Sequence, residues 1–141
     1  KEIALKVKKG ENVLVMFSGV GVYGIVLFKL SKAGKVVCVE ISRECNKYAR
    51  ENVKRNKLDN IEVVQGDVRK KIGREKEVDQ KFDRIVMARP NLKDSFLDVA
   101  FPKIKKKGVI HYYGFSDKII IYKKVDKNYK RFVCNLFTNA T

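Results

Sequence analysis

The chain has 141 residues, of which 45% are hydrophobic and 10% aromatic, so one domain spanning residues 1–141 can bury a substantial core. This composition excludes an intrinsically disordered chain, and no apolar run approaches the roughly 18 residues that a membrane-spanning helix requires. Lysine and arginine number 32 against 16 acidic residues, a formal net charge of +16, which is typical either of a polyanion-binding protein or of a lysine-rich, soluble surface.

Cysteine usage narrows the class of protein further. Cys38, Cys45 and Cys134 form no C-x-x-C pair and are scattered through element-like segments. No signal-peptide pattern opens the sequence. We therefore expect reduced thiols, a cytoplasmic protein without a membrane segment, and no metal site.

Apolar runs of strand length recur along the chain and predict five buried strands. They are Asn12–Phe17, Lys35–Ile41, Ile61–Gln65, Phe82–Ala88 and Gly108–Phe115. Runs that are apolar on both faces suit a parallel sheet covered by helices.

Helical patterns fill three of the gaps between these runs. Val22–Lys32 follows a glycine-rich turn, and Ser42 is placed to cap a second helix that ends near Lys57. A third helix is expected over Asp94–Lys105, although Pro102 disturbs its last turn. Alternating strands and helices predict an α/β domain with right-handed crossovers.

The C-terminal region has a different pattern. Lys118–Val125 and Tyr129–Phe137 flank the turn residues Asp126–Asn128, which predicts an antiparallel hairpin. Only Gly114–Asp117 lies between the fifth and sixth expected strands, too short for a parallel crossover. Either the last strands run as a meander or residues are omitted from the chain.

The most informative motif is a G-x-G-x-x-G formed by Gly19, Gly21 and Gly24, where a strand leads into a helix. The first two glycines allow a tight turn and close approach of the backbone to a ligand. Glu40 follows about 20 residues later, at the end of the second strand, where an acid accepts both ribose hydroxyls of a nucleotide. This pairing occurs in sites for NAD and for S-adenosylmethionine.

Features after the second and third strands favour S-adenosylmethionine. Asp67 ends the third strand, where methyltransferases carry an acid that accepts from the adenine amino group; its alternative role is to cap the following turn. Ile41 would lie against the adenine face, or would be an ordinary core residue. The expected closing hairpin points the same way.

Three pieces of sequence then carry a family resemblance: "MFSGVG", "ENVKRNK" and "GVIHYYGF". Together with the segments between them, from Ile3 to Phe115, they resemble the archaeal and eukaryotic tRNA (guanine-N1)-methyltransferases. The resemblance implies a Rossmann-like class I S-adenosylmethionine-dependent fold, mainly parallel with a C-terminal antiparallel hairpin. It also implies methyl transfer to N1 of guanosine at tRNA position thirty-seven, with tRNA as partner. Related wyosine-pathway aminocarboxypropyltransferases share much of the pattern.

The resemblance also implies a set of site residues. Arg89 and Pro90 would lie beside the reacting base, at the carboxyl end of the fourth strand, where sites in open α/β sheets gather. The cofactor pocket would comprise Phe17, Gly19, Gly21, Glu40, Ile41, Asp67 and Val68.

The sequence departs from the family at informative positions. Val15 stands where members usually carry aspartate, and Ala88 replaces the asparagine thought to hold the guanine edge. Arg89 could substitute by donating to guanine O6 or N7, or could be a solvated or phosphate-binding arginine. The upstream segment with the family's arginine and glutamate, and its tRNA-binding domains, are expected to be absent.

Methylation at guanine N1 requires that a proton be removed, and Asp94 and Glu2 are the candidate bases. His111, the sole histidine, lies in an apolar run and is expected to be structural. Three other functions remain open: a truncated or non-catalytic domain that binds cofactor or RNA, aminocarboxypropyl transfer to a tRNA wyosine precursor, and NAD-dependent reduction.

Overall fold

The computed structural model describes residues 2–74, 77–87, 89, 94–115 and 131–137. Its centre is a six-stranded sheet in the order β3-β2-β1-β4-β5-β6, and every neighbouring pair is parallel. The strands are β1 (Asn12–Met16), β2 (Lys35–Glu40), β3 (Ile61–Gln65), β4 (Phe82–Met87), β5 (Ile104–Phe115) and β6 (Arg131–Phe137). The five predicted strands are all present, which confirms the α/β class.

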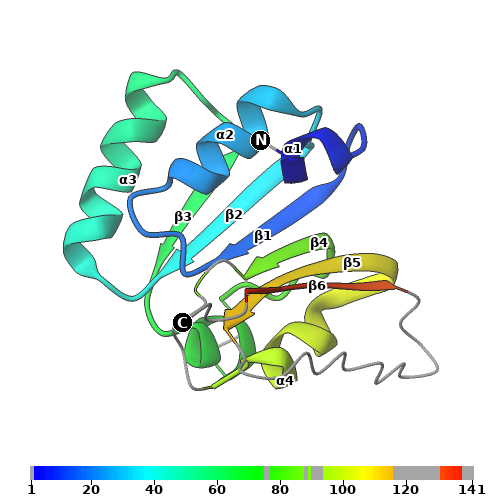
Figure 1. Ribbon diagram of the computed structural model, residues 1–141. Helices are drawn as coiled ribbons and strands as arrows, with labels where there is room; N and C mark the ends of the chain where they lie inside the picture. The colour runs from blue at the N-terminus through cyan, green and yellow to red at the C-terminus, as the bar shows by residue number, and fades with distance from the viewer. Residues whose placement is uncertain (1, 75–76, 88, 90–93, 116–130, 138–141) are drawn as a thin grey trace.

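Helices cover both faces of this sheet (Figure 1). The helices are α1 (Glu2–Lys6), α2 (Val22–Leu30), α3 (Arg43–Arg55), the π-helix η1 (Arg69–Arg74), α4 (Leu97–Ala100) and the 3-10 helix η2 (Phe101–Lys103). α1, α2 and α3 lie on one side of the strands, and α4 lies on the other.

Alternation along the strands divides the core between the two faces. Leu14 and Met16 of β1 pack with residues of η1 and α4, whereas Val13 and Val15 pack with α1 and α2. All four side chains are at most 1% exposed. Burial on both faces is the reason that β1 reads as a continuous apolar run.

The second helix begins as its sequence predicts. Ser42 is the N-cap of α3, and its Oγ accepts a hydrogen bond from the Cys45 N–H at 3.2 Å. The buried Asn46 side chain donates to the backbone oxygens of Glu40 and Ser42, both at 2.7 Å. The start of α3 is thereby fixed to the end of β2.

The third helix is much shorter than predicted. Only Leu97–Ala100 is α-helical, followed by one 3-10 turn, and β5 already begins at Ile104. Phe96 has a left-handed backbone (φ 53°), which prevents an earlier start. Pro102 lacks the N–H needed to extend the helix, so the chain leaves it after one turn.

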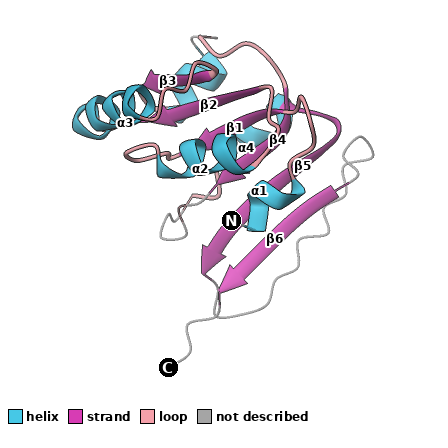
Figure 2. Cartoon of the chain, turned by 90° about the horizontal axis from the view of Figure 1, so that it is seen from above, coloured by secondary structure: helices cyan, strands magenta, loops and turns pink. Residues whose placement is uncertain are grey.

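The C-terminal strand also differs from the expected pairing. β6 runs parallel to β5, from Val109 opposite Arg131 to Phe115 opposite Phe137 (Figure 2). Residues 116–130 separate the two strands, enough chain for the dozen or so residues that a parallel connection needs. The described pairing is therefore parallel throughout. Lys118–Val125, the other half of the predicted hairpin, lies outside the described residues, and the hairpin is not confirmed.

Candidate active site

The candidate site lies at the carboxyl edge of the sheet, where the segments following β1, β2, β3 and β4 come together. Because all strands are parallel, their carboxyl ends meet at one edge. Ligands of open α/β sheets bind at this edge. Each segment contributes at least one residue singled out by the sequence.

The three glycines of the motif have different structural roles. Gly19 (φ 54°) faces open space, with no atom within 4 Å of the position a Cβ would take. A Cβ added to Gly21 (φ 83°) would lie 3.2 Å from the Cβ of Ala49 in α3. Gly24 allows α2 to pack on β2, since a Cβ added there would lie 2.4 Å from Cys38 Sγ. Only Gly19 therefore presents an open backbone surface to a ligand.

Glu40 connects the turn after β1 to the turn after β2. Its Oε2 accepts the Gly19 N–H at 2.9 Å, and its Oε1 accepts the Ser42 N–H at 2.9 Å. The side chain is 8% exposed. A carboxylate can accept about four hydrogen bonds, so two acceptor positions remain for hydroxyl groups.

The side chains next to Glu40 differ in what they offer a nucleoside. The buried Ser18 hydroxyl, adjacent to Gly19, has the Cys38 thiol as its hydrogen-bond partner. Ile41 is 59% exposed, so its alternative role as an ordinary core residue is wrong. An exposed apolar side chain beside an acceptor pair suits a ligand with both polar and flat apolar groups.

The other predicted pocket residues differ in accessibility. Asp67 Oδ1 accepts the backbone N–H groups of Arg69 (2.7 Å) and Lys70 (3.3 Å), so Asp67 caps η1. Val68 is 4% exposed and packs in the core, which leaves only its backbone for a ligand. Phe17 is half-buried, has a left-handed backbone (φ 59°), and packs its ring on Phe96.

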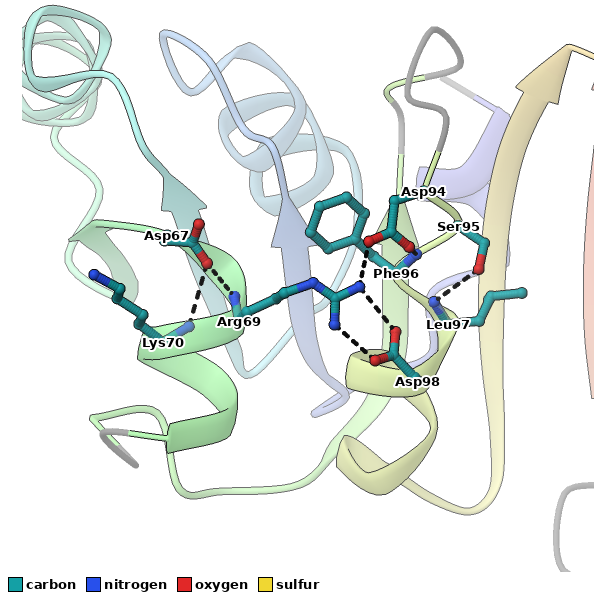
Figure 3. Close-up of polar contacts among 8 residues, drawn as sticks. All are labelled: Asp67, Arg69, Lys70, Asp94, Ser95, Phe96, Leu97 and Asp98. Atoms are coloured by element: carbon teal, nitrogen blue, oxygen red, sulfur yellow. Dashed lines mark hydrogen bonds and ion pairs between the residues drawn. The ribbon is translucent and has the colours of Figure 1, made fainter.

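A cluster formed by Arg69, Asp94, Phe96 and Asp98, here called the Arg69 cluster, connects η1 to the segment that begins α4 (Figure 3). Arg69 forms an ion pair with Asp94 and a two-pronged one with Asp98, with N–O distances of 2.6 and 3.3 Å to Asp98. The guanidinium carbon lies 4.6 Å from the Phe96 ring centroid. The Phe96 ring in turn meets Phe17 edge-to-face, with centroids 5.0 Å apart. The segments after β1, β3 and β4 are thus joined.

The electrostatics of this cluster count against Asp94 as a general base. The Phe96 N–H and the Arg69 guanidinium both lower the pKa of Asp94, and Arg69 lowers the pKa of Asp98. Glu2 is exposed on α1, where the hydrogen bond that it accepts from Lys6 lowers its pKa. Neither candidate base has the raised pKa that proton removal near neutral pH favours.

The residues expected beside the reacting base are only partly placed. Arg89 is exposed directly after β4, whereas Ala88 and Pro90 lie outside the described residues. Val15, the departure from the family's aspartate, is 1% exposed and pairs with Cys38 and Val86 in the sheet. An ionised carboxylate there would be buried in an apolar layer, so the valine removes an unfavourable charge from this core.

His111 is structural, as the sequence predicts. It is 1% exposed, and its Nε2 accepts a hydrogen bond from Arg84 Nη1 at 2.7 Å. Burial and the Arg84 charge lower its pKa to about 4. Burial likewise raises the pKa of the Cys38 thiol to about 12, so this cysteine is an unreactive core residue.

Within the described ranges no group of three or more potential ligand side chains could hold a metal ion. In the same residues, no helix is both long and apolar enough to cross a membrane.

Two residues that organise this edge, Asn46 and Arg69, were not predicted from the sequence. The signal for Arg69 was an acid pair: Asp94 and Asp98 are four residues apart and would share one face of the helix expected over Asp94–Lys105, although in the structure Asp94 precedes α4. No comparable signal pointed to Asn46.

Comparison with known proteins finds a match to the TRM5/TYW2 methyltransferase domain over residues 1–138. The chain is 42% identical over 109 residues to the tRNA (guanine(37)-N(1))-methyltransferase Trm5b of Pyrococcus abyssi, covering 77% of this chain and 30% of that protein. It is 33% identical over 124 residues to the tRNA(Phe) (4-demethylwyosine(37)-C(7)) aminocarboxypropyltransferase of Methanocaldococcus jannaschii, covering 88% of this chain and 48% of that protein.

A solved structure agrees with these matches. The crystal structure of M. jannaschii TYW2 in complex with AdoMet superposes with a TM-score of 0.73 at 32% identity, covering 89% of this chain and 56% of that one. The chain thus spans less than half the length of these two curated relatives.

Proposed function

The chain belongs to the TRM5/TYW2 methyltransferase domain family, and from this premise we propose that it transfers a methyl group from S-adenosylmethionine to N1 of guanosine 37 in tRNA. The observation that carries the proposal is the geometry of Glu40, which holds the Gly19 turn open at the carboxyl edge. Family relatives that act on this guanosine share 42% and 34% of aligned residues with the chain.

The cofactor of this family domain is S-adenosylmethionine, and related structures contain it or its demethylated product. When bound, it supplies an electrophilic methyl group. In the proposed arrangement the Glu40 carboxylate accepts the ribose hydroxyls, Ile41 packs on the adenine, and Asp67 accepts from the adenine amino group. The open backbone at Gly19 gives the cofactor room without a Cβ contact.

The protein's part in the reaction is mainly to align donor and acceptor and to exclude water. Phe17 and Phe96 form an apolar wall at this edge, and the Arg69 cluster holds Phe96 in place. Arg89 is exposed after β4, where it can donate to O6 or N7 of guanine. With Ala88 in place of asparagine, Arg89 is the donor that we assign to base recognition.

A second candidate is aminocarboxypropyl transfer from the same cofactor to a tRNA wyosine precursor. It is favoured by the match to the M. jannaschii aminocarboxypropyltransferase, which covers a larger share of this chain than the match to P. abyssi Trm5b. The two candidates use the same pocket but transfer different carbon groups from the sulfonium centre.

The test is a transfer assay on two tRNAs that differ only in carrying guanosine or 4-demethylwyosine at position 37. Mass spectrometry of the nucleosides separates a single added methyl group from the much heavier aminocarboxypropyl group. Addition of one methyl to guanosine, lost when guanosine 37 is replaced by adenosine, supports the proposal. An aminocarboxypropyl product contradicts it in favour of the second candidate.

Cofactor binding is measured independently by isothermal titration with S-adenosylmethionine, using NADH as a control. Binding without transfer to either tRNA identifies the chain as a cofactor-binding domain that does not catalyse the reaction alone.

A further inference from the structure

A second concave surface lies at the amino edge of the sheet, opposite the candidate active site. Residues that precede or begin β1, β4 and β5 surround a groove of about 790 Å³. Strands of five or six residues at about 3.3 Å per residue place the two edges on the order of 15–20 Å apart. The groove is therefore separate from the Glu40 pocket.

The groove is strongly cationic. Among the described residues, six lysines and Arg84 line it, against two acids, Glu11 and Asp83. Both acids already have cationic partners: Glu11 Oε2 accepts from Arg84 Nε at 2.9 Å, and Asp83 Oδ2 accepts from Lys105 Nζ at 3.0 Å. The acids therefore neutralise Arg84 and Lys105, and Lys6 pairs with Glu2 at 2.9 Å, which leaves the positive charge of the other four lysines.

Four lysines supply most of the remaining charge: Lys8, Lys9, Lys106 and Lys107. All four are exposed, and none has an ion pair within the part of the chain that the structure describes. They come from two segments about a hundred residues apart in sequence, which the pairing of β1, β4 and β5 brings together. Lysines that serve only to keep a surface solvated do not have to gather around a groove, so this arrangement favours a binding role.

The wall of the groove is held rigidly. Arg84 is 4% exposed and donates to Glu11, to His111 and, at 2.8 Å, to the backbone oxygen of Lys6. This buried network ties the end of α1 to β4 and β5, so the lysines that follow α1 stand opposite those that begin β5. A rigid wall lowers the entropy cost of binding a polyanion.

We propose that this groove binds the sugar–phosphate backbone of the RNA, away from the nucleotide that reacts. The inference rests on the proposed function only in taking RNA as the polyanion. Lysine ammonium groups act as point charges toward phosphates, and none of the described residues that line the groove is an aromatic on which a base could stack. The groove therefore supplies salt-sensitive affinity that does not depend on nucleotide sequence.

The test compares two triple variants by binding of a fluorescent tRNA transcript at several salt concentrations. Lys8→Gln, Lys9→Gln and Lys106→Gln remove three of the four exposed lysine charges of the groove; Lys107 is left unchanged so that the groove variant and its control lose the same number of charges. The matched control, Lys54→Gln, Arg55→Gln and Lys57→Gln, removes three exposed charges from the end of α3. Binding of S-adenosylmethionine by all three proteins shows that each is folded.

We expect the groove variant to bind tRNA at least tenfold more weakly than the control variant at moderate salt. The slope of log K against log salt should become shallower by about two to three, at roughly 0.7–0.9 per lost phosphate contact. Equal losses in the two triple variants, an unchanged slope in the groove variant, or absence of tRNA binding by the wild-type chain would each overturn the inference.

The results that would contradict the proposed function differ from those that would contradict the groove. A wild-type chain that binds tRNA through the groove but transfers no carbon group contradicts the proposed function and leaves the groove intact. If the wild-type chain methylates tRNA and the groove variant binds tRNA equally tightly, the proposed function stands and only the proposed role of the groove is contradicted.

Discussion

The two edges of the sheet use opposite charges for different tasks. At the carboxyl edge, acidic side chains accept backbone N–H groups and shape the turns, as Glu40 and Asp67 do. At the amino edge, the acids neutralise part of a lysine-rich groove and leave the rest exposed. Hydrogen-bond geometry can select a specific small molecule, whereas unpaired lysines attract any polyanion. One sheet thus separates selective from non-selective recognition.

The largest expected effect tests the carboxyl edge. Glu40→Gln keeps the size of the side chain but removes the charge and one acceptor for the Gly19 and Ser42 N–H groups. We expect S-adenosylmethionine to bind about 100-fold more weakly, because a charge-assisted hydrogen bond contributes about 2–3 kcal/mol. Isothermal titration measures the change, and urea denaturation checks the fold.

Glu44→Gln is the matched control, since Glu44 is an exposed acid in the first turn of α3. Its affinity should equal that of the wild type. If both variants bind equally well, Glu40 does not hold the ribose, and selectivity at this edge has another origin.

The second effect probes the network behind the amino-edge groove. Burial and the charge of Arg84 lower the His111 pKa from 6.5 to about 4, with Lys6 also lowering it and Glu2 opposing it. As the pH falls from 6.5 to 4, His111 therefore becomes protonated in the unfolded chain but stays neutral in the folded chain. Stability contributed by neutral His111 should fall by about 3 kcal/mol across this window and stay constant below it.

Urea denaturation at a series of pH values measures this loss. The His111→Gln variant retains an acceptor for Arg84 but does not titrate, so its stability should change less between pH 6.5 and pH 4. Parallel pH profiles for the two proteins would show that His111 is not kept neutral in the folded chain.

The third effect concerns the packing beneath the glycine turn. Gly24→Ala should destabilise the fold by about 1–2 kcal/mol, even though alanine favours helices, because its Cβ would lie 2.4 Å from Cys38 Sγ. Gly73→Ala is the control, since no atom lies within 4 Å of its Cβ position. Addition of Cys38→Ala should restore part of the loss, and a double variant no more stable than Gly24→Ala would refute the clash. Chemical denaturation provides the comparison.

The smallest effect belongs to the exposed Arg69 cluster. Arg69 lowers the pKa of Asp98, so the stability from this pair is present above pH 3.8 and is lost as the pH falls through the lower, folded value. Asp98→Asn should flatten the stability profile below pH 3.8 and cost little at pH 7, since exposed ion pairs contribute little. An acid profile identical to that of the wild type would indicate that the pair does not form in solution.

The strands were predictable because burial on both faces leaves a direct trace in the sequence. β1 and β2, buried at every position after the first, read as apolar runs only one residue longer than the strands. β5 was recognised from Gly108 although it begins at Ile104. The third helix was not predictable from periodicity, since Phe96 adopts a left-handed backbone despite its side chain. Tertiary contacts with Phe17 and Arg69 stabilise that backbone, and no local pattern reveals them.

The site was predictable to the extent that it depends on backbone turns. Gly19 and Glu40 were identified from spacing alone, because the turn and its acid occupy fixed offsets in this fold. Arg84 was not identified as buried, since an arginine in a strand normally indicates exposure. Its burial depends on Glu11 and His111, which lie far from it in the sequence.

Because Glu40 hydrogen-bonds the turns after β1 and β2, it also affects the thermodynamics of cofactor binding. With Gly19 and Ser42 already hydrogen-bonded to Glu40, the loop is ordered before any nucleoside arrives. The conformational entropy of this loop is therefore lost during folding, and cofactor binding involves no further loss from ordering it. Cofactor association should behave as a rigid-body fit, with a fast on-rate and hydrogen exchange at Gly19 that is slow even in the unliganded chain.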